Sequence, residues 1–405
     1  MDSTRDTDRL PWRVWQGCLI MMAVAALLLC MGPDAVAQEG RVRVPDDHQF
    51  VHPGILQNAG ELEFVREKVQ AGEEPWQSAW ETMRAHDVAQ LDWEPDPYQE
   101  VARGAYNNPD IGATELMQDG QAAYAHALRW YITEDEAHAE KSVEVLNAWP
   151  PVLETITEHD ARLLVGMAGI NYANAAELMR HTYEGWAQED QERFEGMLRG
   201  VFYPVIEDFY PTANGNWDAA MMQTMMAMGV FLDDPGMFNR GVDYFMYGRG
   251  NGAITNYINE QGIVQESGRD QAHTQMGLGY LGCAAEIGWK QGLDLYGAFD
   301  NRLAKGYEYT AQYNLGHDVP YEPFTSIEQR YHYPEISDQG RGNFSPIYER
   351  VYNHYHNRAG LDMPYTAEVV ENERPEGQSN AYVSWGTLFA ELPAFEKGEE
   401  PDASE

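Results

Sequence analysis

The chain has 405 residues, of which 43% are hydrophobic, and its formal net charge at pH 7 is −38. This length is enough for a large core and is compatible with roughly two or three domains, or with one large helical or barrel fold. The acidic residues are spread along the chain, which is typical of a solvated acidic surface in a salt-adapted host. The charge argues against nucleic acid as a partner, because phosphate binding requires a basic stripe. An anionic substrate requires a site that is locally positive, or screening of the remaining charge by salt.

The N-terminal residues predict an export signal. Arg9 and Arg13 precede the apolar run CLIMMAVAALLLCMG, and the small-x-small pattern AVAQ predicts cleavage after Ala37. The run is short for a membrane-spanning helix, and no later segment qualifies. We therefore expect a periplasmic or secreted protein that is free of the membrane once residues 1–37 are removed. Cys283 is then alone, which predicts a small buried side chain and no internal disulfide.

Helical segments dominate the chain after an extended opening that reaches about Gly54. Asn58 and Glu61 have the spacing of a capping box and predict the start of the first helix. Later segments carry apolar residues at three- and four-residue spacing and are separated by Gly, Pro or Asn. These segments form pairs: 120–132 with 136–149, 161–181 with 191–210, 216–232 with 235–248, and the helix that begins near 269 with 293–315.

Helical hairpins in series indicate either an open solenoid or a closed ring. The segments lack a short strict repeat, so we predict an all-α fold, an incomplete (α/α) toroid over residues 38–392. After Leu315 the chain is rich in Pro, Tyr, His and Gly, which predicts an irregular C-terminal segment of the kind that usually carries function. Residues 393–405 are expected to form an acidic disordered tail.

Four ionisable residues, Glu266, Arg269, Asp270 and His273, stand at the start of an apolar segment. In a helix over 269–289, Arg269, His273 and Tyr280 would fall within about 40° of one another. Each has an ordinary alternative. Glu266 and Arg269 can form a structural ion pair, Asp270 can favour the helix N-terminus electrostatically, and a histidine can be a satisfied structural residue.

Small residues continue the same face of this helix. Gly277, Gly279 and Gly282 would let a ligand or another backbone approach the polar side chains. The position of His273 beside Arg269 and Tyr280 on this face raises a catalytic interpretation of His273 above the structural one. His354 and His356 form an H-x-H pair, but without further ligand spacing this is poor evidence for a metal. We expect neither an essential metal nor a cofactor.

The segments NGNWDAAMM and GIVQESGRDQAH, followed by AAEIGWKQGLDLY, resemble the alginate lyase superfamily. Family five of the polysaccharide lyases has matching motifs at Asn214 or Asn216 with Trp217, at Glu266 with Arg269, and at the Gly-x-Asp-Leu-Tyr of residues 292–296. A closer likeness is to the family thirty-eight type, through RDQAHTQMGLGYL, EYTAQYNLG, RGNFSPIYERVYNHY and WGTL, and it covers roughly residues 50–390. The resemblance implies an α/α toroid and β-elimination on alginate or a related polyuronide such as glucuronan.

The sequence also departs from family five. Trp217 stands where that family has a histidine, and Met276 stands where it has its catalytic tyrosine. The resemblance therefore carries over only Asn216 and Arg269. His273 lies one turn before the absent tyrosine and is our candidate for the proton-abstracting role. The chondroitin AC lyases show Asn, His, Tyr and Arg in the order of Asn216, His273, Tyr280 and Arg341, which is an analogy.

β-Elimination removes the C5 proton of a uronate and expels the 4-linked oxygen. The uronate carboxylate must first be neutralised, for which we predict Asn216 and Arg269. A base near neutral pKa suits His273, and a tyrosine suits the acid. The tyrosine stays open among Tyr280, Tyr348, and Tyr331 or Tyr333 of the irregular segment. Tyr348 lies seven residues after Arg341, a spacing that would place both on one helix face. The expected substrate-binding residues are Trp217, Glu266, Asn214 and Tyr331.

Two other functions are compatible with the residues. A glycoside hydrolase on the same toroid would need two carboxylates across a groove, with Asp218, Glu266 and Asp270 as candidates. A non-catalytic exported glycan-binding protein would need no catalytic carboxylates. The sequence predicts an anionic polysaccharide as the partner in the lyase case. It does not set the choice among mannuronate, guluronate and glucuronate, endo or exo action, or the oligomeric state.

Overall fold

The computed structural model describes residues 41–393, and the residues from Arg43 on form a unit of their own. The expected export signal lies outside the described residues, as does the expected acidic tail beyond Pro393. Within the described part, no helix has the length and apolarity needed to cross a membrane.

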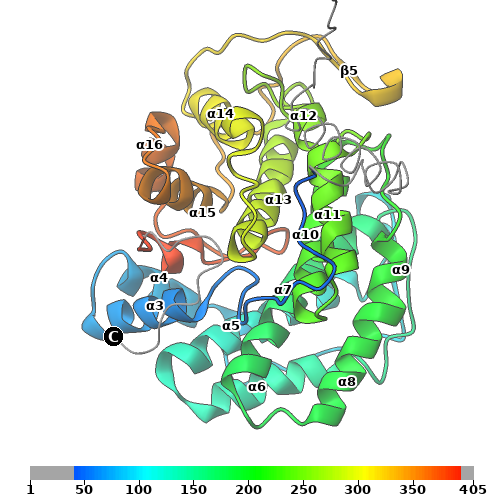
Figure 1. Ribbon diagram of the computed structural model, residues 1–405, viewed down its shortest axis with the longest axis vertical. Coiled ribbons are helices and arrows are strands. Elements are labelled where there is room, and N and C mark those ends of the chain that lie inside the picture. The colour runs from blue at the N-terminus through cyan, green and yellow to red at the C-terminus, as the bar shows by residue number, and fades with distance from the viewer. Residues whose placement is uncertain (1–40, 394–405) are drawn as a thin grey trace, which may run out of the picture. The chain divides into compact units, whose positions relative to one another are not determined.

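Helices make up most of this unit (Figure 1). The longer ones are α3 (Ala59–Ala71), α4 (Trp76–Arg84), α5 (Ala113–Thr133), α6 (Glu136–Ala148), α7 (Ala161–Thr182), α8 (Gln188–Met197), α10 (Gly215–Phe231), α11 (Pro235–Tyr247), α13 (Gln271–Lys290), α14 (Ala298–Asn314) and α16 (Pro364–Glu373). Shorter helical pieces are η1 (Asp87–Ala89), η2 (Ala105–Asn107), η3 (Leu198–Phe202), α9 (Tyr203–Ile206), α12 (Ile254–Tyr257), η4 (Ile327–Gln329), α15 (Tyr348–Tyr352), η5 (Asn353–Arg358) and η6 (Gly386–Phe389).

The predicted helical hairpins are confirmed: α5 pairs with α6, α7 is followed by α8 and α9, α10 packs on α11, and α13 packs on α14. The first helices of these hairpins also contact one another in chain order, α5 with α7, α7 with α10, and α10 with α13. This succession of inner helices, each followed by an outer one, is the predicted all-α (α/α) toroid. The capping box of α3 is confirmed as well, with Asn58 accepting from the Glu61 backbone N–H and Glu61 accepting from that of Asn58.

Helix α10 is at the centre of this packing, between α7, α11 and α13 (Figure 1). It is apolar around most of its circumference, with buried methionines at 221, 222, 225, 226 and 228, and such a helix is stable only when it is surrounded by other helices. Gly166 allows α7 to approach closely, since a Cβ there would lie 2.7 Å from the backbone of Ala220.

Helix α13 begins two residues later than predicted. Asp270 is its N-cap and accepts the His273 backbone N–H at 2.8 Å, so Arg269 lies before the helix. The glycines of α13 were expected to admit a ligand or a backbone, but they accommodate packed side chains. Gly277 faces Tyr257, and Gly279 faces Ile347 and Tyr382. Cys283 is free and buried, as predicted.

Strands are few. β1 (Glu100–Arg103) pairs antiparallel with β2 (Asp110–Ile111) and parallel with β3 (Thr155–Thr157), while β4 (Phe324–Thr325) and β5 (His332–Tyr333) form a small hairpin. The segment after Leu315 is irregular as far as α15, after which α15, η5 and α16 return to helical structure. The predicted irregular segment is therefore shorter than expected, and its hairpin brings Tyr333 close to the start of α10.

Candidate active site

A cleft of about 680 Å³ lies where the N-terminal ends of α7, α10 and α13 meet segments from β1 and the β4–β5 hairpin. It is lined by Arg103, Ala105, Tyr106, Asn107, Thr114, Met117, His159, Asp160, Leu163, Met167, Tyr210, Ala213, Asn214, Asn216, Trp217, Arg269, His273, Met276, Arg330, Tyr331, Tyr333, Asn380 and Ala381.

The charge of the cleft is opposite to that of the whole chain. Its described lining includes three arginines, Arg103, Arg269 and Arg330, and a single carboxylate, Asp160. Asp160 is in turn 2.6 Å from the ring Nδ1 of His159. The lining thus carries more positive than negative side chains, which favours an anionic substrate, while Glu266 and Asp270 lie behind it and partner Arg269.

The start of α10 is capped by residues from another part of the chain. Gln265 accepts the Gly215 backbone N–H at 2.9 Å, and Glu266 accepts that of Asn216 at 3.2 Å. Asparagine at an N-cap usually fills this role with its own side chain, but Asn214 does not. Its amide oxygen instead accepts from Gln265 at 2.9 Å and from the Tyr333 hydroxyl at 3.3 Å, and its amide nitrogen has no partner among the described residues. Asn214 thus has a donor to offer to a ligand in the cleft.

Glu266 is fully buried and does not line the cleft, so the expectation that it binds substrate directly is not met. Its carboxylate accepts from Arg269 Nη1 at 2.8 Å and from the Tyr257 hydroxyl at 3.0 Å. Burial raises the pKa of Glu266 above its ordinary value, although the charges of Arg269 and His273 act in the opposite direction. Glu266 therefore positions Arg269, whose Nη2 group has no partner among the described residues.

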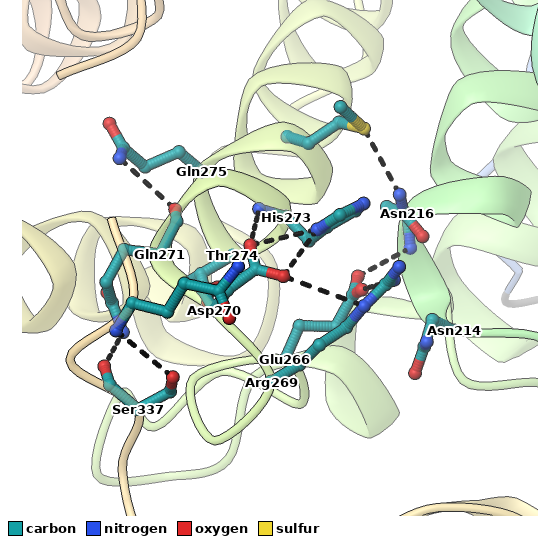
Figure 2. A network of polar contacts seen from close by, with 12 residues as sticks. Asn214, Asn216, Glu266, Arg269, Asp270, Gln271, His273, Thr274, Gln275 and Ser337 are labelled. Carbon is teal, nitrogen blue, oxygen red and sulfur yellow. Dashed lines mark hydrogen bonds and ion pairs between the residues drawn. The ribbon is translucent and has the colours of Figure 1, made fainter. Parts of the chain in front are cut away.

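His273 and Asp270 form a pair at the first turn of α13, and Figure 2 shows the imidazole directed toward Asn216 and the Arg269 guanidinium. The ring Nδ1 is 2.7 and 2.9 Å from the two carboxylate oxygens of Asp270. Burial opposes ionisation of Asp270, but the hydrogen bonds from His273 and the Arg269 charge outweigh it and hold the pKa of Asp270 below its ordinary value. Since Nδ1–H donates to Asp270, the neutral ring has its lone pair on Nε2, which has no partner among the described residues.

Asn216 lies beside this pair at the start of α10. Its side-chain nitrogen contacts the sulfur of Met276 at 3.2 Å, and its amide oxygen is buried without a hydrogen-bond partner in the described part of the protein. The residue lines the cleft together with Asn214. The two asparagines, Arg269 and His273 are thus brought together, as the sequence predicted.

Aromatic side chains also line the cleft. Tyr333 reaches Asn214 with its hydroxyl, and burial raises its pKa to about 12. The Tyr331 ring stacks parallel to that of Tyr333, with their centroids 6.4 Å apart. Trp217 lies edge-on to His159 at 5.4 Å and to Tyr210 at 5.8 Å. Both predicted aromatic contacts, Trp217 and Tyr331, therefore lie in the cleft.

Three of the predicted catalytic residues lie elsewhere. Tyr280 shares the helix face of His273 but is buried in the core against Tyr382, and its hydroxyl has no partner there. Tyr348 is also buried, with its hydroxyl bonded to Gln275 at 3.1 Å. The predicted common helix face of Arg341 and Tyr348 does not exist, because α15 begins only at Tyr348.

Arg341 has a structural role near the end of α14. Its guanidinium donates to the carbonyl oxygens of Tyr313 and His317, each at 2.8 Å, and lies over the Tyr313 ring at 4.0 Å. A cation at a helix C-terminus is stabilised by the helix dipole and satisfies its last carbonyls. Arg341 does not line the cleft.

The carboxylates of the hydrolase alternative do not meet in the cleft, and neither do the histidines of the H-x-H pair. Asp218, Glu266 and Asp270, the carboxylates of a hydrolase, are buried and engaged by neighbouring donors. The H-x-H histidines point apart: His354 stacks on Tyr296 at 3.7 Å, and His356 stacks on Tyr352 at 4.9 Å. Burial lowers the pKa of His354 to about 3.

Part of the cleft was not predicted from the sequence. Arg103, His159, Asp160, Tyr210 and Arg330 reach it from loops and short strands with no motif of their own. One signal was present: Arg330 is the neighbour of Tyr331 in the irregular segment that was expected to carry function.

Comparison with known proteins gives a consistent assignment. The sequence model of the family described as "Alginate lyase" matches residues 77–319, more than half of the chain. No curated protein matches the chain. Among solved structures, alginate lyase A1-III from Sphingomonas species A1 is 14% identical, with a TM-score of 0.61 over 84% of this chain and 98% of that one.

Two further structures are similar. An alginate lyase from Bacteroides ovatus is 17% identical, with a TM-score of 0.58 over 86% of this chain and 98% of that one. A variant of alginate lyase A1-III complexed with tetrasaccharide is 16% identical, with a TM-score of 0.61 over 84% of this chain and 97% of that one. At this identity the structures establish the shared fold, and the sequence match establishes the family. The chain belongs to the alginate lyase family and is a polysaccharide lyase with an (α/α) toroid fold.

Proposed function

We propose that this enzyme cleaves an alginate-like polyuronide by β-elimination and leaves an unsaturated uronate at the new non-reducing end. The observation that carries this proposal is the Asp270–His273 pair beside Arg269 in an arginine-lined cleft. Such a cleft attracts a polyanionic chain, and the pair supplies a base whose tautomer is fixed.

The first requirement of the reaction is neutralisation of the uronate carboxylate. Arg269 lies just before α13 and has its Nη2 group free, in the described structure, to donate to the carboxylate. Asn214 lies just before α10 and can donate from its amide nitrogen. Asn216, the predicted neutraliser, is the third polar side chain in this position. Donors held in place before the reaction stabilise the charge that develops on the carboxylate as the C5 proton leaves, which is the largest contribution to such reactions.

The second requirement is proton transfer. His273 accepts the C5 proton at Nε2, and Asp270 stabilises the imidazolium that forms. The C5–H electron pair becomes the C4–C5 double bond, and the 4-linked oxygen leaves. Tyr333 is the proposed acid, since its pKa of about 12 keeps the phenol protonated at neutral pH and its hydroxyl reaches the same cleft.

The test is product analysis on alginate, polymannuronate, polyguluronate and glucuronan. A lyase generates ultraviolet absorbance from the C4–C5 double bond in proportion to the new reducing ends. Reducing ends without this absorbance would indicate hydrolysis and would end the proposal. The comparison of the four polymers also identifies the preferred uronate.

We also propose that the enzyme acts in the periplasm or outside the cell. The support is the apolar run and the AVAQ pattern within residues 1–37. Mass spectrometry of the protein recovered from its source should give a mature chain that begins at Gln38. A chain that retains residues 1–37 in the cytoplasm would contradict this location.

A further inference from the structure

A cluster of metal-binding side chain types lies at the C-terminal end of α7. Glu177 and His181 are one helical turn apart, and His52 comes from the extended segment before α3. The His52 ring stacks on that of His181, with their centroids 4.5 Å apart and their planes at 10°. One ligand atom from each of the three residues lies within 4.8 Å of the other two.

The hydrogen bonding of this cluster is incomplete. Glu177 is buried, with 1% of its surface exposed, and its Oε2 has no hydrogen-bond partner among the described residues. This oxygen is 3.8 Å from Nε2 of His181, which is too long for a hydrogen bond. A buried carboxylate oxygen without a partner is costly. Two ligand atoms held about 2.0–2.2 Å from one zinc ion in tetrahedral geometry lie roughly 3.4 Å apart, so this pair would need to close from 3.8 Å by about 0.4 Å to share one ion.

The His52 ring bridges two carboxylates, Glu177 and Asp233. Its Nε2 is 3.2 Å from Asp233 Oδ1, and its Nδ1 is 2.7 Å from Glu177 Oε1. If Nε2–H donates to Asp233, the lone pair of the neutral ring is on Nδ1 and faces a carboxylate oxygen. At 2.7 Å a proton lies between the two atoms, and burial of His52 is outweighed by the hydrogen bonds and charges of Glu177 and Asp233, which raise the pKa of His52. A metal ion would have to replace this proton and move the two atoms apart by roughly 0.7 Å. A proton would satisfy Oε1 alone, whereas a metal ion would also engage Oε2 and His181.

We propose that His52, Glu177 and His181 form a structural site for a divalent cation, with Zn²⁺ as the best fit and water as the fourth ligand. Two imidazoles and a carboxylate suit zinc in ligand type and number. Asp233 acts on the far side of His52, where a carboxylate commonly fixes the orientation of a metal-binding histidine. The last turn of a helix also favours a cation, through the helix dipole.

The site would fasten the opening segment of the unit to the helical body. Gly54 donates its backbone N–H to Glu177 Oε1 at 3.0 Å, so the same carboxylate already holds this segment. His52 lies before residues 77–319, over which the family model matches. The cleft lies at the other end of α7, beside Leu163, and a helix of 22 residues separates the two ends by about 30 Å. Metal removal should therefore lower the unfolding temperature and leave the catalytic rate unchanged.

The experiment uses the full purified protein, freed of metal by a chelator and then titrated with Zn²⁺. Metal content per chain is measured by mass spectrometry, and the unfolding temperature is measured with and without Zn²⁺. The variants are His181→Ala and Asp233→Asn, and His356→Ala is the matched control because His356 is exposed and has no carboxylate partner in the described structure.

The expected result is one Zn²⁺ per chain and a higher unfolding temperature for the wild type and for His356→Ala. Asp233→Asn should bind about 10–100-fold more weakly, and His181→Ala should lose at least as much. A wild type that binds no stoichiometric Zn²⁺, or that shows no thermal shift, would leave the His52–Glu177 proton pair as the explanation and would overturn the proposal. Equal affinity in His181→Ala and wild type would overturn it too, since the metal would then bind elsewhere.

Discussion

Asp270 contacts His273 twice: it caps the backbone N–H at 2.8 Å and accepts the ring Nδ1–H at 2.7 Å. The same carboxylate thus begins α13 and fixes the tautomer of the proposed base. Because one carboxylate holds both the first turn of α13 and the imidazole, the position of the base relative to α13 is fixed.

Asp270→Asn separates these two roles. Asparagine caps helices as well as aspartate does, so thermal stability should change by no more than about 1 kcal/mol. The loss of the charge that stabilises the imidazolium should lower kcat by roughly 10²-fold. Turnover is measured by product absorbance and stability by thermal unfolding. A variant with unchanged kcat would reduce Asp270 to a helix cap.

Arg269→Ala should lower kcat by about 10²–10³-fold with a smaller effect on KM, because the guanidinium stabilises charge that develops only in the transition state. It should also cost roughly 1–3 kcal/mol of stability by leaving the Glu266 carboxylate with fewer partners. The Arg269 side chain is 30% exposed, which limits this cost.

The double variant Arg269→Ala/Glu266→Gln is the control. It removes the buried charge and should recover most of the unfolding temperature while kcat stays low. If kcat were to recover together with stability, Arg269 would be a structural residue. A raised KM with unchanged kcat would make it a substrate-binding residue.

Tyr333→Phe and Tyr280→Phe remove the same atom from two different environments. Tyr333→Phe should lower kcat by about 10²–10⁴-fold, because the proposed acid is lost. Tyr280→Phe should retain wild-type kcat and an equal or higher unfolding temperature, since its hydroxyl is buried without a partner in the described structure. The opposite pattern would restore Tyr280 as the acid.

Asp218 provides a prediction about pH. Burial raises its pKa to about 6 from an ordinary value of 3.8, against hydrogen bonds from the Tyr244 hydroxyl and the Tyr210 N–H. A folded-state pKa above the unfolded one means that the folded protein binds the proton more tightly, so the stability from this group is present below about pH 4 and is lost as pH rises through about 6.

Asp218→Asn isolates this effect. Relative to the variant, the wild type should lose about 3 kcal/mol of unfolding free energy between pH 4 and 6, with no further change above. Denaturant unfolding at several pH values measures the difference. Activity should persist in Asp218→Asn, and its complete loss would revive the hydrolase alternative in which Asp218 is catalytic.

The helical hairpins could be predicted from the sequence because an amphipathic or fully apolar segment of this length has few other stable environments. The grouping of Asn214, Asn216, Arg269 and His273 was predictable too, since the resemblance and the charged helix start coincide. The position of Tyr280 was not, because a helical wheel shows the direction of a side chain but not its depth. Seven residues carry the side chain about 10 Å along the helix axis, from the cleft into the core.

The remaining errors concern irregular backbone. Arg341 and Tyr348 were assigned one helix face from their spacing, yet the chain between them is not helical. His159, Arg103 and Arg330 come from loops and short strands whose positions depend on long-range packing. No local pattern places such residues in one cleft.

The most direct test of the account is the turnover of alginate by His273→Ala. Its kcat should fall by at least about 10²-fold, measured by the absorbance of the unsaturated uronate, while its thermal unfolding matches that of the wild type. The Asp270 cap needs only the backbone N–H of residue 273, so the helix start is preserved. A folded His273→Ala protein with near-wild-type turnover would contradict the assignment of His273 as the base.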